Sequence, residues 1–202
     1  MDAAHLVIGL GNPGARYAGT RHNIGFRLME TLAARWGAAW REEGRFTARL
    51  ASARVAGRRV WLCEPLTYMN DSGSAVRAVM EFYRVTQDRV LVAVDDADLE
   101  LGEVRLRPSG GTGGHHGLES VQQSLGNDDY ARLRLGIGRG PGLREITGHV
   151  LGRFAAAEQP RLEAVLLRAA DQVECWLTVG VQRAMNDFNG RIDPPEHKGT
   201  RQ

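Results

Sequence analysis

The chain has 202 residues, of which 43% are hydrophobic and 25% charged, a balance typical of one globular domain that folds without disulfides or a structural metal. The net charge is only +2 although lysine and arginine total 26, so composition permits nucleic-acid binding without requiring it. The sequence shows no secretory signal and no apolar run of membrane-spanning length, which predicts a cytoplasmic protein. Cys63 and Cys175 both lie in apolar surroundings and are expected to be free thiols.

The first half of the chain alternates strand and helix patterns. In chain order it predicts a strand at 6–10, a helix at 23–36, strands at 46–52 and 59–64, and a helix at 72–83. The helix at 23–36 repeats an apolar residue every four positions and then meets Gly37, a common stop signal. Ser72 is expected to be the N-cap of the next helix. A turn at 56–58 is expected to join the two strands, and Pro65 to end the second.

The second half continues this alternation around one irregular segment. It predicts a strand at 90–94, a strand at 104–107, a helix at 117–125, a strand at 132–138, and helices at 160–178 and 181–188. Residues 90–94 are all β-branched or aliphatic apart from one alanine, which is typical of a central strand covered on both faces. Segment 108–117 is dense in glycine and is expected to be irregular.

This interleaving of strands and helices, without a repeat or a linker, predicts a single α/β domain. The expected architecture is a three-layer sandwich in which helices cover a mixed, largely parallel twisted sheet. The domain is expected to span residues 1–192. Residues 193–202 are polar and carry prolines, so they are expected to be a flexible tail.

The segment from Gly9 to Gly14 matches G-x-G-x-x-G and follows a strand, as a dinucleotide-binding fingerprint does. Its context differs from that fingerprint. The next helix does not open immediately, Asn12-Pro13 imposes a turn, and the acidic residue about 20 positions on, Glu30, lies inside a helix. We therefore interpret the segment as a glycine turn and expect no cofactor.

Polar residues gather at predicted strand ends and in the glycine-rich loop, where an α/β sheet usually places its site. They are Asn12, Thr20 to Asn23, Tyr68 to Asn70, Asp95 to Asp98, and Gly113 to Gly117. A histidine beside a carboxylate can take a proton from water while the carboxylate orients the ring. The chain has no G-x-S-x-G motif and no cysteine in a reactive setting, which favours direct activation of water. Asparagine side chains suit an amide-rich substrate and a developing oxyanion.

Each of these groups also has a structural interpretation. His22 can cap the helix that begins beside it, and the carboxylates at 95–98 can form a charged turn or bind a divalent cation. His115 and His116 are adjacent, so their side chains diverge and form a poor metal pair. The joint pattern, rather than any single residue, favours a hydrolytic centre that works without a metal.

That joint pattern resembles the bacterial-type peptidyl-tRNA hydrolase family. The matching motifs are VIGLGNPG from Val7, TRHN from Thr20, YMNDSG from Tyr68, DDADL from Asp95, the loop from Gly110 to Leu118, RLRLGIG from Arg132, VLG from Val150 and AMNDFN from Ala184. The resemblance runs in order from about Leu6 to Asn189, so several independent motifs support it.

The resemblance implies hydrolysis of the ester between a peptide and the 3′ end of tRNA, which recycles the tRNA. It implies that His22 is the general base and that Asp95 orients it. The residues it implies for substrate binding are Asn12, Tyr17, Tyr68, Met69, Asn70, His115 and His116. The residues it implies for tRNA binding are Arg107, Arg134 and Arg144. It also implies a monomer that needs no metal, with peptidyl-tRNA as its partner.

One position departs from the family pattern. The family usually has His-Asn in the glycine loop, whereas this chain has His115-His116. Histidine can still donate a hydrogen bond through one ring nitrogen, but its shape and titration differ from those of asparagine. We expect altered or reduced affinity for the peptide and retained chemistry.

Two other functions compete with this prediction. A non-catalytic RNA-binding protein, similar to the splicing factors of plant organelles that resemble this family, would bind RNA tightly and release no peptide. The presence of His22, Asp95, Asn12 and Asn70 favours an enzyme. A nicotinamide-dependent enzyme would bind NADH, so an unchanged fluorescence on titration with NADH would exclude it.

Overall fold

The computed structural model describes residues 4–139 and 146–192. Its strands are β1 (His5–Gly9), β2 (Arg41–Glu43), β3 (Ala48–Val55), β4 (Arg58–Pro65), β5 (Val90–Asp96), β6 (Glu103–Arg107), β7 (Ala131–Gly136) and β8 (Gly190–Arg191). Its α-helices are α1 (Ile24–Trp36), α2 (Ser72–Tyr83), α3 (His116–Leu125), α4 (Ile146–Val150), α5 (Gln159–Thr178) and α6 (Val181–Phe188). Arg144 and the tail expected from residue 193 lie outside the described residues.

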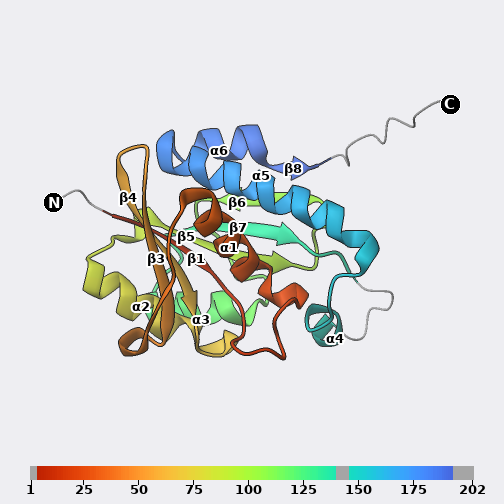
Figure 1. Cartoon of the computed structure of the whole chain (residues 1–202), viewed down its shortest axis with the longest axis horizontal. Helices are drawn as coiled ribbons and strands as arrows, with labels where there is room; N and C mark the ends of the chain where they lie inside the picture. Colours follow the sequence, from red (N-terminus) through yellow and green to blue (C-terminus); the bar gives the residue numbers. More distant parts are fainter. Residues whose placement is uncertain (1–3, 140–145, 193–202) are drawn as a thin grey trace.

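These strands form one mixed sheet in the order β2-β3-β4-β1-β5-β7-β6-β8 (Figure 1). The four central strands, β4, β1, β5 and β7, run parallel. The strands outside them pair antiparallel. The predicted mixed sheet is confirmed, with parallel pairing limited to its centre. The carboxyl ends of the parallel strands therefore meet along one edge.

Helices cover both faces of this sheet, as Figure 1 shows: α1, α5 and α6 on one side, α2 and α3 on the other. Strand β1 shows why its sequence is a continuous apolar run. Val7 packs into the core beneath α1 and α5, whereas Leu6 and Ile8 pack into the core beneath α2 and α3. Successive side chains of a strand point to opposite faces, so a strand covered on both sides needs apolar residues throughout. The predicted three-layer α/β sandwich is confirmed.

The predicted helices and main strands are confirmed to within a few residues, and the differences have local causes. Ser72 is not an N-cap but the first residue of α2, where its hydroxyl donates to the Met69 carbonyl at 3.0 Å. The chain enters α2 through a 3-10 turn, η3 (Met69–Asp71), so the helix already has a preceding turn. Phe46, predicted in a strand, lies in the 3-10 turn η2 (Gly44–Phe46). Strands β2 and β8 and helix α4 are too short to produce a periodic pattern.

Helix α1 approaches β1 so closely that only glycine fits between them. A Cβ atom on Gly25 would lie 2.6 Å from the Leu10 carbonyl oxygen and 2.7 Å from that of Ala93. A Cβ atom on Gly11 would lie 2.9 Å from the Phe26 ring. Glycines of the Gly9–Gly14 segment thus permit close packing, and they bring the start of α1 down onto the edge of the sheet. Over the described residues, no helix has both the length and the apolar character needed to cross a membrane.

Candidate active site

Segments that follow different strands converge at the carboxyl edge of the parallel strands. Asn12 follows β1, η3 follows β4, and Asp95 lies near the end of β5. His22 lies in a 3-10 turn, η1 (Arg21–Asn23), which leads into α1. Polar residues accumulate here because the strands end and their backbone passes into loops.

The turn that carries His22 is held by the residue before it. The Arg21 guanidinium donates to both carboxylate oxygens of Glu158, at 3.0 and 2.7 Å, from a position that is only 9% exposed. It also lies over the Phe154 ring, 4.6 Å from the ring centroid. Both of these charge-assisted hydrogen bonds come from Nη2, and together with the ring contact they hold Arg21 in place. The second half of the chain therefore positions His22.

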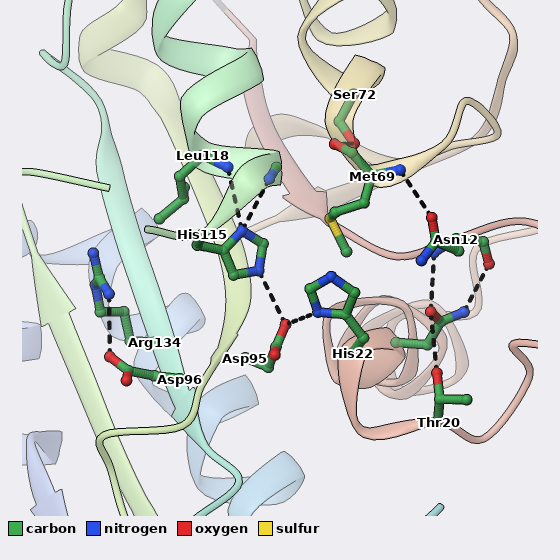
Figure 2. Close-up of polar contacts among 12 residues, drawn as sticks. Asn12, Thr20, His22, Met69, Ser72, Asp95, Asp96, His115, Leu118 and Arg134 are labelled. Carbon is green, nitrogen blue, oxygen red and sulfur yellow. Dashed lines mark hydrogen bonds and ion pairs between the residues drawn. The ribbon is translucent and has the colours of Figure 1, made fainter. Parts of the chain in front are cut away.

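Two histidines share one oxygen of Asp95, as Figure 2 shows. His22 Nδ1 lies 2.8 Å from Asp95 Oδ1, and His115 Nε2 lies 3.0 Å from the same atom. The Asp95 residue is only 4% exposed, and the two imidazole centroids are 5.1 Å apart. A buried carboxylate thus joins two rings that come from opposite layers of the sandwich.

Backbone contacts determine which His115 nitrogen carries the proton. His115 is the N-cap of α3, and its Nδ1 accepts the backbone N–H groups of Gly117 at 3.1 Å and Leu118 at 3.3 Å. A neutral imidazole has a single N–H, so Nε2 of His115 is the protonated nitrogen and donates to Asp95. When neutral His22 likewise donates from Nδ1 to the carboxylate, its Nε2 holds a free lone pair. That lone pair can accept a proton from water.

The same hydrogen bonds control the ionisation of Asp95. Burial by itself would raise the pKa of this carboxyl group, because it disfavours the charged form. The hydrogen bonds from His115 and His22 outweigh burial and lower the pKa of Asp95 well below its ordinary value. Asp95 is therefore ionised at neutral pH and can stabilise an imidazolium on His22.

Over residues 4–139 and 146–192, His22, Asp95 and His115 are also grouped as a metal ion would require, since their ligand atoms lie within 4.8 Å of one another. The hydrogen bonding described above favours a different use. Nε2 of His115 carries a proton and its Nδ1 is occupied by two backbone donors, so neither nitrogen offers a lone pair to a cation.

Asparagines fix the wall of the site opposite Asp95. Asn12 Oδ1 accepts the Met69 backbone N–H at 2.9 Å, which ties the loop after β1 to η3. The Asn23 carboxamide bonds both the backbone N–H and the carbonyl of Asn12, each at 2.9 Å. With its oxygen and its backbone held, Asn12 has its side-chain NH₂ left to donate to a ligand.

A cleft of about 690 Å³ opens over these groups. Of the residues predicted from the sequence, it is lined by Asn12, His22, Tyr68, Met69, Asn70, Asp95, His115, His116 and Arg134. Tyr68 is 63% exposed and Leu151 39% exposed, so the rim is apolar while the floor is polar and charged. The cleft offers a base, an orienting carboxylate and amide donors.

Comparison with known proteins assigns this fold and cleft to a family. The family model described as peptidyl-tRNA hydrolase matches residues 6–197. The peptidyl-tRNA hydrolase of Synechococcus sp. (strain JA-3-3Ab) is 49% identical over 93% of this chain and 83% of its own length. That of Geobacillus kaustophilus is 45% identical over 91% of this chain and 98% of its own.

The chain belongs to the peptidyl-tRNA hydrolase family. Among solved structures, the crystal structure of the peptidyl-tRNA hydrolase from Acinetobacter baumannii superimposes with a TM-score of 0.88. That match has 36% sequence identity and covers 95% of this chain and 97% of the other. The resemblance noted in the sequence motifs is confirmed.

Two residues that the family resemblance implied for binding lie outside the cleft. Tyr17 is half-buried in the loop before η1, beside the Arg16 guanidinium, and does not line the cleft. Arg107 ends β6 and is exposed, and it does not line the cleft either. Arg144 lies outside the described residues.

The structure also adds residues to which the sequence assigned no role. Asp96 pairs with Arg134 at 3.1 Å, and Val150 and Leu151 form part of the apolar rim of the cleft. The VLG motif from Val150 marked this segment as family-like without indicating a role. The position of Val150 and Leu151 depends on the contact of α4 with η1, and these two elements are distant in the chain.

Proposed function

We propose that this chain hydrolyses the ester between the peptide and the 3′ end of tRNA in peptidyl-tRNA, with His22 as general base and Asp95 as its orienting carboxylate. The observation that carries the proposal is the single Asp95 oxygen shared by two imidazoles, of which only His22 has a nitrogen left for catalysis. Membership of the peptidyl-tRNA hydrolase family supplies the substrate.

The proposed reaction needs only a base, a water molecule and amide donors. His22 Nε2 takes a proton from water while the water oxygen attacks the ester carbonyl carbon. The bond from carbon to the ribose oxygen then breaks, and the imidazolium returns the proton to that oxygen. The products are a free peptide carboxyl group and a tRNA with a free 3′ hydroxyl. Asp95 stabilises the transient imidazolium.

The remaining cleft residues are proposed to hold the substrate. The NH₂ groups of Asn12 and Asn70 donate to peptide carbonyls and to the developing oxyanion. Tyr68 and Met69 contact the peptide at the apolar rim, and His116 takes the place that asparagine has in the family pattern. His115 acts through Asp95 as a positioning residue, because both of its ring nitrogens are occupied.

The arginines of β6 and β7 are proposed to bind tRNA phosphates. Arg105 faces Arg134 and Arg107 faces Arg132 in register across these two strands, so the four side chains share one face of the sheet. Arg132 is only 1% exposed and donates to the Asp128 carbonyl, so the other three are the ones proposed to reach phosphate. Glu103 and Asp96 pair with Arg105 and Arg134. Like charges directly opposite one another are unfavourable unless an anion lies between them. A phosphate backbone supplies such anions. Arg107 and Arg134 belong to this proposal, as does Arg144.

Tyr17 remains a proposed contact for parts of the substrate outside the cleft. We further propose that the enzyme acts as a monomer in the cytoplasm, as the family resemblance implies. Sedimentation velocity of the purified chain tests whether it is a monomer.

The decisive experiment is peptide release from N-acetylated aminoacyl-tRNA by wild type and by His22→Ala. We expect kcat to fall by about two to four orders of magnitude, because the general base is lost. Binding of the tRNA substrate should be retained. The matched control is His5→Ala. His5 begins β1, at the end of the strand away from the cleft, so this variant should keep nearly full activity.

Circular dichroism and thermal melting show whether each variant folds. Activity near wild type in a folded His22→Ala would remove His22 as the base. A wild-type protein that binds tRNA and releases no peptide would support the non-catalytic RNA-binding alternative.

A further inference from the structure

A second hollow, of about 700 Å³, lies beside the catalytic cleft on the side of α1. Its walls come from the loop after β1, from α1, from β3 and β4, and from α5. Asn12 lines both this hollow and the cleft, so the two are neighbours across one residue. The hollow plays no part in the water activation proposed above.

Two carboxylates in this hollow share a single guanidinium group. Arg49 Nη1 donates to Glu30 Oε1 at 3.0 Å and to Glu64 Oε2 at 2.9 Å. The other oxygen of Glu30 accepts from Trp40 Nε1 at 2.9 Å. The other oxygen of Glu64, Oε1, has no hydrogen-bond partner among the described residues, although the Glu64 side chain is only 1% exposed. Such a buried acceptor is costly unless something binds it.

When Glu64 loses its proton, the charged groups of the hollow lack one cation. Burial raises the pKa of Glu64 to about 8, and the opposing charge of Arg49 does not restore its ordinary value. The other charged groups that line the hollow are Arg27 and Glu30 from α1 and Glu163 from α5. With Glu64 ionised, the hollow contains three carboxylates and two guanidinium groups, and one more positive charge would balance them.

We propose that this hollow binds a primary ammonium group, with Glu64 Oε1 as its acceptor. An ammonium group carries three donors on a compact point charge, which suits a carboxylate whose one oxygen has no hydrogen-bond partner among the described residues while the other is occupied. A metal ion is less suited, since among the described residues the group with metal-binding spacing is His22, Asp95 and His115, not this one.

Two sources can supply such an ammonium group. One is the peptide of the substrate, through a lysine side chain or a free N-terminus. This source rests on the proposed function, and the shared wall at Asn12 places the hollow within reach of a peptide held in the cleft. The other source is a free amine. The two sources share the same chemistry at Glu64 and are separated by experiment.

The first experiment compares peptidyl-tRNAs that differ only in lysine or norleucine at each of the first few peptide positions. We expect wild type to prefer lysine at one position by about tenfold in kcat/KM, and Glu64→Gln to lose that preference. Glu81→Gln, an exposed carboxylate of α2, should keep it. Turnover of the norleucine substrates by wild type tests the proposed function separately, because it requires no ammonium group.

The second experiment needs no variant. Calorimetry of wild type with 1-aminobutane, which is cationic throughout, should show affinity at pH 9 at least tenfold higher than at pH 6.5, because Glu64 must lose its proton to bind. Butan-1-ol should not bind in this way. A lysine preference assigns the hollow to the substrate peptide, and amine binding without that preference assigns it to a free amine. Absence of both overturns the proposal.

Discussion

Asp95 connects the chemistry of the site to the stability of the fold. Two hydrogen bonds to one buried oxygen hold this carboxyl group in its ionised form. A group whose pKa is lowered by folding stabilises the protein above its unfolded pKa and loses that contribution as pH falls through its folded value. The stabilisation from Asp95 is therefore present at pH 5 and above, and it disappears in acid.

The loss of this stabilisation in acid leads to an expectation for Asp95→Asn. Between roughly pH 4 and pH 2.5, the free energy of unfolding of wild type should fall by about 1–2 kcal/mol more than that of the variant. Urea denaturation at several pH values in this range measures the difference. Parallel acid profiles of the two proteins would contradict the assigned pKa direction. The same variant should lack activity at neutral pH.

His116 is the residue at which this chain departs from the family pattern, and its side chain is open to solvent. It is 77% exposed, and its Nδ1 lies 3.1 Å from Glu119 while its ring lines the cleft. We expect His116→Asn to change KM by roughly three- to tenfold and to leave kcat nearly unchanged, because the residue borders the peptide and not the base. Steady-state kinetics on one peptidyl-tRNA gives both constants. If neither changes, His116 has no role in peptide affinity.

At the scale of elements, the position of His22 depends on how closely α1 lies on the sheet. Gly25 is three residues beyond His22, and its α-carbon faces the backbone of Leu10 and Ala93. No flexible side chain separates these backbones, so an added methyl group must push the helix away.

Gly25→Ala should therefore lower the free energy of unfolding by about 2–3 kcal/mol and reduce kcat as well. Gly44→Ala is the matched control, because a Cβ atom there meets nothing within 4 Å. Denaturant unfolding and peptide-release assays on both variants provide the comparison. Equal stability of the two variants would mean that α1 accommodates the added methyl group without loss of stability.

At the scale of the whole molecule, the arginine face of β6 and β7 is the proposed second contact with the substrate. Arg107 lies on this face, two residues beyond Arg105 and outside the cleft. Its contribution should therefore be electrostatic and independent of the chemical step.

We expect KM for a tRNA-linked substrate to rise with salt, and Arg107→Ala to raise KM and reduce the slope of log KM against log salt by about one. Arg59→Ala is the control, since Arg59 is exposed near the start of β4, which β1, β5 and β7 separate from β6 in the sheet. Kinetics at four or five salt concentrations separate the two variants. A salt-independent KM for wild type would remove phosphate binding from the proposal.

The sequence by itself determined the helices, the principal strands and the three-layer order. Apolar periodicity is local, so β1 and β5 were recognisable as strands buried on both faces, and α1 as a helix that ends at Gly37. It also indicated most of the cleft, because polar residues that follow parallel strands must meet at one edge of the sheet. The family resemblance paired His22 with Asp95, and their ring nitrogen and oxygen lie 2.8 Å apart.

Only the tertiary structure decided how these groups are connected. The resemblance implied substrate binding for His115, and the fold adds that its ring lies between Asp95 and the amides of α3, a contact that depends on the packing of that helix against the sheet. The Glu64 oxygen that lacks a hydrogen-bond partner among the described residues likewise lies where β3, β4 and α1 meet, and α1 is distant from the two strands in the chain. No local pattern records such a meeting, because hydrogen bonds between distant segments follow from packing and not from periodicity.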